Sequence, residues 1–150
     1  MTPQAVDYSD LIKSFARGRQ TTSVKTAARV GPGPLLAYCI GVAGLEKFGH
    51  RRPLVYVAWG NDHWLDGWAA ALGAVDIVTR QPIAAPAEPV SDLLKDLDFA
   101  GNNGWFDAPG KRDARRILQE LDRLVGRNYA IGAMLAADHS RKSLDALQKL

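Results

Sequence analysis

The sequence predicts a single α/β domain in which a small, mostly parallel sheet of two or three strands is flanked by helices and followed by a C-terminal antiparallel helical hairpin. Three observations predict this fold. The apolar run 53–59, PLVYVAW, has almost no polar alternation and is typical of a strand covered on both faces. A helix over 62–73 joins it to a second strand over 75–80, as in a right-handed parallel βαβ unit. Near the C-terminus, Gly126 separates two helical segments that predict an antiparallel pair.

The N-terminal part divides into a helical segment, 1–20, and a sheet-forming βαβ core, 23–80. An amphipathic pattern predicts a helix over 6–17 that Gly18 ends, and the Thr- and Val-rich stretch that follows allows a strand at 23–30. Residues 34–48 are apolar on nearly every face, which predicts a buried helix at the centre of the core. Cys39 is then expected to be a small buried hydrophobic residue inside that helix.

A connector over 81–107 leads to the predicted helical hairpin over 108–150. The connector contains several prolines, a short helix at 91–98 that Ser91 caps, and a glycine-rich loop that Phe99, Trp105 and Phe106 are expected to pin to the core. Asp107 is expected to cap the first helix of the hairpin, and a second helix runs from Asn128 toward Leu150. The first helix buries one apolar stripe, made of Ile117, Leu118, Leu121, Leu124 and Val125.

Composition excludes several classes of protein. Hydrophobic residues make up 47% and charged residues 23%, as in an ordinary globular chain and unlike a disordered one. The single cysteine excludes an internal disulfide framework and a multi-cysteine zinc site. The N-terminus lacks the pattern of a signal peptide, and the longest apolar stretch, 35–45, is far shorter than the roughly 20 residues that span a bilayer. We therefore expect a soluble, cytoplasmic protein with no membrane partner.

Charge is distributed unevenly along the chain. Residues 1–60 carry eight basic and three acidic residues, 61–110 carry two and eight, and 111–150 carry nine and five, for a net charge of +3. Basic ends permit a nucleic-acid partner, but a mixed surface is also ordinary for an Ala- and Arg-rich protein of bacterial type. The acids show no EF-hand or zinc-ligand spacing, so no metal site is predicted, and no cofactor is indicated.

Ligands of open parallel sheets bind beyond the carboxyl ends of the strands, and this rule selects three loops. The first is Gly31-Pro32-Gly33, which precedes a predicted helix whose N-terminus favours an anion, although Pro32 and the following Pro34 lack N–H donors. The second is Gly60-Asn61-Asp62-His63, and the third contains Arg80, whose charge would neutralise an anion. We therefore expect Gly31, Gly33, Gly60 and Arg80 to bind the ligand.

The second loop carries the candidate catalytic residues Asn61, Asp62 and His63. His63 is able to exchange protons near neutral pH, and Asn61 is able to polarise a carbonyl group or orient a water molecule. The alternative is that Asn61 or Asp62 caps the helix and His63 lies on the surface. Neighbouring residues of a helix do not face each other, so Asp62 is not positioned to orient His63 as in a triad. The triplet Asp138-His139-Ser140 fails as a triad for the same reason and is expected to be part of the last helix or a kink in it.

Two further groups are candidates for interactions with a partner. Trp64 and Trp68 share one face of the predicted helix, where they either pack in the core or form a partner surface. Arg112, Arg115 and Arg116 lie at the start of a helix, where cations oppose the helix dipole. That placement suits either an acidic or polyanionic partner or a solvated helix face.

These features leave three hypotheses for function. The first is a small domain that binds an anionic or nucleotide-like ligand at the strand-end loops and is possibly a hydrolase or transferase. The second is a non-catalytic protein-interaction module, such as an inhibitor, immunity or assembly protein. The third is a nucleic-acid-binding protein that uses its basic ends. No complete catalytic motif decides whether the protein is an enzyme.

Overall fold

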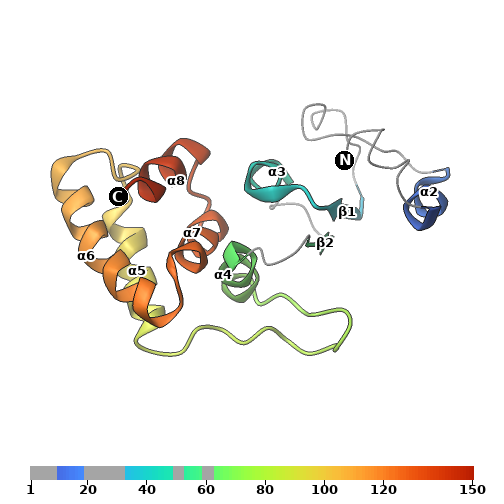
Figure 1. The fold of residues 1–150 in the computed structure, drawn as a ribbon, viewed down its shortest axis with the longest axis horizontal. Coiled ribbons are helices and arrows are strands. Elements are labelled where there is room, and N and C mark those ends of the chain that lie inside the picture. The colour runs from blue at the N-terminus through green and yellow to red at the C-terminus, as the bar shows by residue number, and fades with distance from the viewer. Residues whose placement is uncertain (1–9, 19–32, 49–52, 59–62) are drawn as a thin grey trace. The chain divides into compact units, whose positions relative to one another are not determined.

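The computed structural model describes residues 10–18, 33–48, 53–58 and 63–150, and Figure 1 shows its elements. The fold is mixed α/β, with helices predominating in the described residues. The chain forms two compact units, residues 1–60 and residues 61–150. The first unit holds a parallel two-stranded sheet, and the second contains helices α4 to α8.

The sheet of the first unit pairs β1, Leu35–Tyr38, with β2, Leu54–Val57. The strands are parallel, and Leu35 lies opposite Leu54. Helix α3, Gly41–Phe48, connects them, so the three elements form a βαβ unit. Ala37 on β1 and Leu45 and Phe48 on α3 are buried and form the apolar core of this unit.

The prediction of one buried helix over 34–48 is wrong, because this segment contains both β1 and α3. The break lies at Cys39 and Gly41, whose φ angles of 51° and 60° do not fit a right-handed helix. A short apolar run such as 35–38 suits a strand or a buried helix equally, and here pairing with 54–57 satisfies its backbone groups. Cys39 therefore lies just beyond a strand, outside any helix, and it is partly exposed.

The predicted strand over 75–80 is also wrong. The Asp76 carboxylate accepts hydrogen bonds from the backbone N–H groups of Val78, at 2.7 Å, and Thr79, at 3.1 Å, and so holds this stretch in a turn. A single antiparallel bridge between Val75 and Pro82 closes the turn at its base. The sequence predicted a βαβ unit over 53–80, whereas the structure has its βαβ unit over 35–57. The observed unit therefore begins one strand earlier in the chain.

The N-terminal helix agrees with the sequence where it is described. Helix α2, Asp10–Ala16, lies within the predicted range of 6–17, and Gly18 follows it with a φ of 73°. The predicted strand at 23–30 lies outside the described residues. Strand β2 agrees with the predicted strand over 53–59, but Val55 is 38% exposed, so the strand is not enclosed on both faces.

Helices α4, His63–Ala71, and α7, Arg127–Ala136, cross very closely in the second unit. Two glycines allow this approach. A side-chain carbon at Gly67 would overlap the carbonyl group of Tyr129, and one at Gly132 would overlap the carbonyl group of Trp64. Burial raises the pKa of Tyr129 beside this crossing, and the nearby Asp66 carboxylate raises it further.

Helices α5, Val90–Ala100, and α6, Ala108–Leu124, pack side by side in the same unit (Figure 1). As predicted, Asp107 caps α6, and its carboxylate accepts a hydrogen bond from the Gly110 N–H at 2.8 Å. The buried stripe of α6 ends at Leu121, because Leu124 and Val125 are exposed. The prediction was therefore right for Ile117, Leu118 and Leu121 and wrong for the last two positions.

The last predicted helix is divided into α7 and α8, Arg141–Gln148, so three helices occupy residues 108–150 where two were expected. Asp138, between α7 and α8, has a φ of 63°, which ends the helical path. Ser140 then caps α8 by accepting a hydrogen bond from the Ser143 N–H at 3.3 Å. Throughout the ranges that the structure describes, no helix has both the length and the apolar character needed to cross a bilayer.

Candidate functional site

The junction between β1 and α3 is a short strand-to-helix turn in the first unit. Strand β1 ends at Tyr38, and α3 begins at Gly41, so only Cys39 and Ile40 separate them. The φ of Cys39 lies in the left-handed region, which residues with a side chain adopt uncommonly. The Cys39 N–H donates to the carbonyl oxygen of Val57 at 2.9 Å, which fixes the start of the turn against β2.

Small residues flank Cys39 at the positions that such a turn requires. Ala37, two residues before it, is buried, and Gly41, two residues after it, has a positive φ at which a side chain would be strained. The Cys39 thiol consequently lies at the carboxyl end of a parallel strand and just before the N-terminus of a helix. Cys39 itself precedes the first residue of α3 by two positions, so its backbone stands next to the positive end of that helix.

Of the predicted catalytic trio, only His63 lies among the described residues. Asn61 and Asp62 lie outside those residues, while His63 is exposed at the first position of α4. Two predicted ligand-binding residues, Gly31 and Gly60, also lie outside them. Gly33 is exposed just before β1 with a φ of 129°, and Arg80 is exposed in the turn after Asp76 with a φ of 60°.

The two tryptophans of α4 differ in burial. Trp68 is only 7% exposed and packs in the core of the second unit, which was one of the two alternatives for this pair. Trp64 is partly exposed. Arg112, Arg115 and Arg116 are all exposed on the N-terminal half of α6, so each guanidinium group is accessible to solvent.

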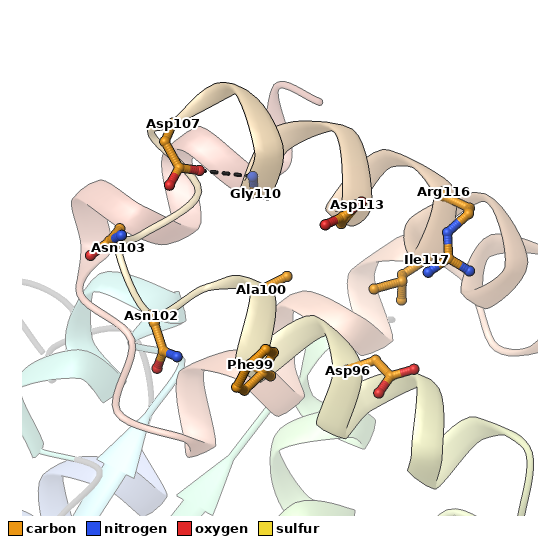
Figure 2. Close-up of a pocket in the computed structure, with 10 residues that line it drawn as sticks. All are labelled: Asp96, Phe99, Ala100, Asn102, Asn103, Asp107, Gly110, Asp113, Arg116 and Ile117. Atoms are coloured by element: carbon orange, nitrogen blue, oxygen red, sulfur yellow. Dashed lines mark hydrogen bonds between the residues drawn. The ribbon is translucent and has the colours of Figure 1, made fainter.

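A pocket of about 450 Å³ lies between α5 and α6 (Figure 2). Helix α5 contributes Asp96, Phe99 and Ala100, and α6 contributes Gly110, Asp113, Arg116 and Ile117. The loop between the helices closes one end with Asn102, Asn103 and Asp107. The structure thus brings Arg116, a predicted interaction residue, together with acidic residues of the 88–107 segment.

The loop that closes this pocket is held by a buried tryptophan. Trp105 is completely buried, and its indole N–H donates to the Leu97 carbonyl oxygen at 3.1 Å. Gly104 and Trp105 both have positive φ values, and a side-chain carbon at Gly104 would meet Phe106 and Ser143. The expectation that Trp105 pins the loop is confirmed, whereas Phe99 and Phe106 are exposed.

His139 stacks on the same tryptophan and ties it to α5. The two ring centroids are 4.4 Å apart, and His139 Nε2 lies 2.7 Å from Asp98 Oδ1. Ser140 meanwhile caps α8. Asp138, His139 and Ser140 therefore form a break between two helices, as one alternative from the sequence held, and do not form a catalytic triad.

The sequence did not predict two features of the structure, the β1–α3 turn and the pocket between α5 and α6. The pattern Ala37-Tyr38-Cys39-Ile40-Gly41, with small residues two positions before and after a cysteine, was a signal for the β1–α3 turn, but the apolar run around it favoured a helix. The pocket between α5 and α6 left a weaker signal, because its charged residues come from segments separated by a loop. Only folding brings Asp96 and Arg116 to one cavity.

The described residues show no place where three histidine, cysteine, aspartate or glutamate side chains gather closely enough to hold one metal ion. Comparisons of the chain with protein-family profiles, curated proteins and solved structures find no match.

Proposed function

We propose that the protein binds a small ligand at the carboxyl ends of β1 and β2 and acts on it as a hydrolase or acyltransferase, with Cys39 as its nucleophile. The observation that supports this is the left-handed φ of 51° at Cys39, between a parallel strand and a helix. A residue other than glycine adopts such a conformation at a cost of roughly 1–3 kcal/mol, and such residues cluster at functional sites.

The physical reason for this geometry is the presentation of one reactive side chain. A sharp strand-to-helix turn lifts the nucleophile above the edge of the sheet, and small residues two positions before and after it keep the turn tight. The Gly-x-Ser-x-Gly junction of many hydrolases is built in this way. Ala37-Tyr38-Cys39-Ile40-Gly41 follows that pattern, with alanine at the first small position and cysteine in place of serine.

The reaction that this arrangement suits is acyl transfer. The thiol loses its proton to solvent, and the thiolate attacks the carbonyl carbon of an ester, forming a C–S bond while negative charge develops on the carbonyl oxygen. In this type of turn the N–H of the following residue, here Ile40, stabilises that oxygen. Cleavage of the C–O bond releases the alcohol, which takes up a proton. Water, or an acceptor alcohol, then attacks the thioester and restores the thiol.

Two sequence-based predictions concern features to which the Cys39 mechanism gives no role, namely the loop residues 61–63 and the charge of the ligand. The predicted roles of His63, Asp62 and Asn61 in proton transfer and ligand orientation stay predictions apart from the Cys39 site, because these residues belong to the second unit. An anionic or nucleotide-like group on the ligand remains the expectation, because the positive end of α3 favours negative charge. The interaction and nucleic-acid hypotheses gain no specific observation from the site.

The proposal is tested by acetylation with p-nitrophenyl acetate at neutral pH. Because Cys39 is the chain's one cysteine, the site of acetylation is assigned directly by peptide mass spectrometry. We expect the native protein to be acetylated at Cys39 at least about tenfold faster than the same protein unfolded in urea, because the helix N-terminus raises the fraction of thiolate. We also expect the thioester to hydrolyse, giving repeated turnover.

Two variants complete the test. Cys39→Ser should lose the rapid acetylation, and Gly41→Val, which strains the turn, should reduce the rate toward that of the unfolded chain while circular dichroism shows an unchanged helix content. Equal rates for native and unfolded protein, or acetylation only at lysines, would show that Cys39 is not an activated nucleophile.

A further inference from the structure

We infer that the pocket between α5 and α6 binds a small zwitterion of the amino-acid type that carries an apolar or aromatic side chain. This site lies in the second unit and uses no residue of the β1–α3 turn. It is therefore independent of the proposed function, and a failure of either proposal leaves the other standing.

The size and frame of the pocket suit a small molecule. Its volume of about 450 Å³ lies within the range of roughly 300–1,000 Å³ that is typical of small-ligand sites. Its walls are two packed helices, and Asp107 and Gly110 fix the start of α6 through their hydrogen bond of 2.8 Å. Trp105 fixes the loop at the closed end. A site framed in this way needs little rearrangement to bind, which favours affinity.

The charged side chains of the pocket include both signs. Figure 2 shows Arg116 of α6 near the same end as Asp96 of α5, with Asp113 one turn before Arg116. In the described parts of the chain Arg116 makes no ion pair, and the one ion pair of Asp113 is a long contact of 3.9 Å with Arg112. One guanidinium and three carboxylates therefore line a common space. Asp107 is engaged in capping α6, whereas Arg116, Asp96 and Asp113 are able to bind new partners.

A zwitterion matches this arrangement better than an ion of a single sign. The planar guanidinium of Arg116 suits a carboxylate group. Asp113 and Asp96 suit an ammonium group. A simple anion would meet the repulsion of the carboxylates, and a simple cation would leave Arg116 unused and repelled.

An apolar surface completes the pocket. Phe99 lines it and is 79% exposed. Ile117 lines it from the opposite helix and is buried. A ligand side chain placed between these two residues would remove the Phe99 ring from water, and an aromatic one would stack on it.

The test uses L-phenylalanine as the probe, with three compounds that each lack one feature. Phenethylamine lacks the carboxylate, 3-phenylpropionate lacks the ammonium group, and glycine lacks the ring. We expect saturable binding of L-phenylalanine to the full chain, followed by NMR, with shifts concentrated at residues 96–117. Each of the other three compounds should bind at least about tenfold more weakly, because each loses one charge-assisted or apolar contact.

Matched arginine variants locate the carboxylate contact. Arg116→Gln should weaken the binding of L-phenylalanine about tenfold and remove its advantage over phenethylamine. Arg115→Gln, which changes an equally exposed neighbour outside the pocket, should alter the affinity less than about twofold. The inference is overturned if no probe gives saturable binding, if phenethylamine binds as tightly as L-phenylalanine, or if the two variants weaken binding equally.

Discussion

Single residues decide how closely the helices of the second unit pack. Gly67 and Gly132 lie where α4 and α7 cross, and each faces a backbone carbonyl group of the other helix. In most helices an alanine is more favourable than a glycine by about 1 kcal/mol, so glycine here is explained by the space it leaves. Backbone cannot move aside as a flexible side chain does, and an added methyl group must push the helices apart.

We predict that Gly132→Ala destabilises the protein by about 2–4 kcal/mol, despite the higher helix propensity of alanine. Overpacking of a rigid contact usually costs about 1–3 kcal/mol, and the backbone position of the obstacle places this site at the upper end. Urea unfolding followed by circular dichroism measures the change.

Ala71→Ser, at an exposed position of α4, is the control and should change the free energy of unfolding by less than about 0.5 kcal/mol. A stability of Gly132→Ala equal to that of the wild type would mean that the two helices cross at a greater distance.

Trp105 shows what the sequence reveals about a single side chain. An aromatic residue in a glycine-rich loop indicated an anchor, and its burial confirms this. Its partners, the Leu97 carbonyl group and the His139 ring, come from α5 and from the break before α8. Such partners depend on tertiary packing, which a local pattern does not encode. For the same reason the pattern did not separate Trp105 from the exposed Phe99 and Phe106.

At the scale of elements, the capping signals gave one correct helix start and one wrong one. Asp107 caps α6, whereas α5 begins at Val90 after Pro89 without a side-chain cap, so the predicted cap at Ser91 is wrong. Asp107 and the α6 stripe as far as Leu121 were predicted correctly, because side-chain capping and helical periodicity are local properties. The run 34–48 was assigned wrongly because a strand and a buried helix share the same apolar composition. The run 75–80 was assigned wrongly because its apolar residues lie exposed in a turn. Pairing with β2 decided the first case, and the Asp76 carboxylate decided the second.

Asp107→Ala should lower the free energy of unfolding by about 1 kcal/mol, because it removes the acceptor of the Gly110 N–H at the start of α6. Asp107→Asn retains a side-chain oxygen at this position and should preserve most of the stability. Thermal unfolding of the three proteins under identical conditions measures both effects. If the two variants are equally destabilised, the carboxylate acts through its charge at the helix N-terminus and not as a hydrogen-bond acceptor.

For the whole molecule, the sequence predicted a parallel βαβ unit and placed it one element too late in the chain. That shift also explains why the candidate site in the structure, the β1–α3 turn, is not one of the loops that the sequence indicated. The rule that ligands bind at the carboxyl ends of strands selected the loop after β2 and the loop before residue 34, but the junction after β1 was hidden inside a supposed helix. The Ala37-x-Cys39-x-Gly41 pattern indicates a tight strand-to-helix turn only when residues 35–38 form a strand.

We predict that residues 61–150 fold without the rest of the chain. Their core is formed by their own helices, with Leu97, Trp105, Leu118 and Leu147 fully buried. The isolated fragment should be helical by circular dichroism and should unfold cooperatively on heating. The Trp105→Phe variant of the fragment serves as control and should unfold at a lower temperature, because the Leu97 carbonyl group loses its donor. A fragment that unfolds gradually would contradict this prediction.

The close crossing of α4 and α7 also has a consequence for synthesis on the ribosome. Helix α4 is translated first, and its partner α7 begins only at Arg127, after α5 and α6. Until then the Gly67 and Trp68 face of α4 has no α7 to cover it, whereas the neighbours α5 and α6 can pair as soon as both have emerged. The nascent chain thus carries an uncovered apolar face on α4 until residues 127–136 have been translated, and the synthesis of α7 determines when that surface is closed.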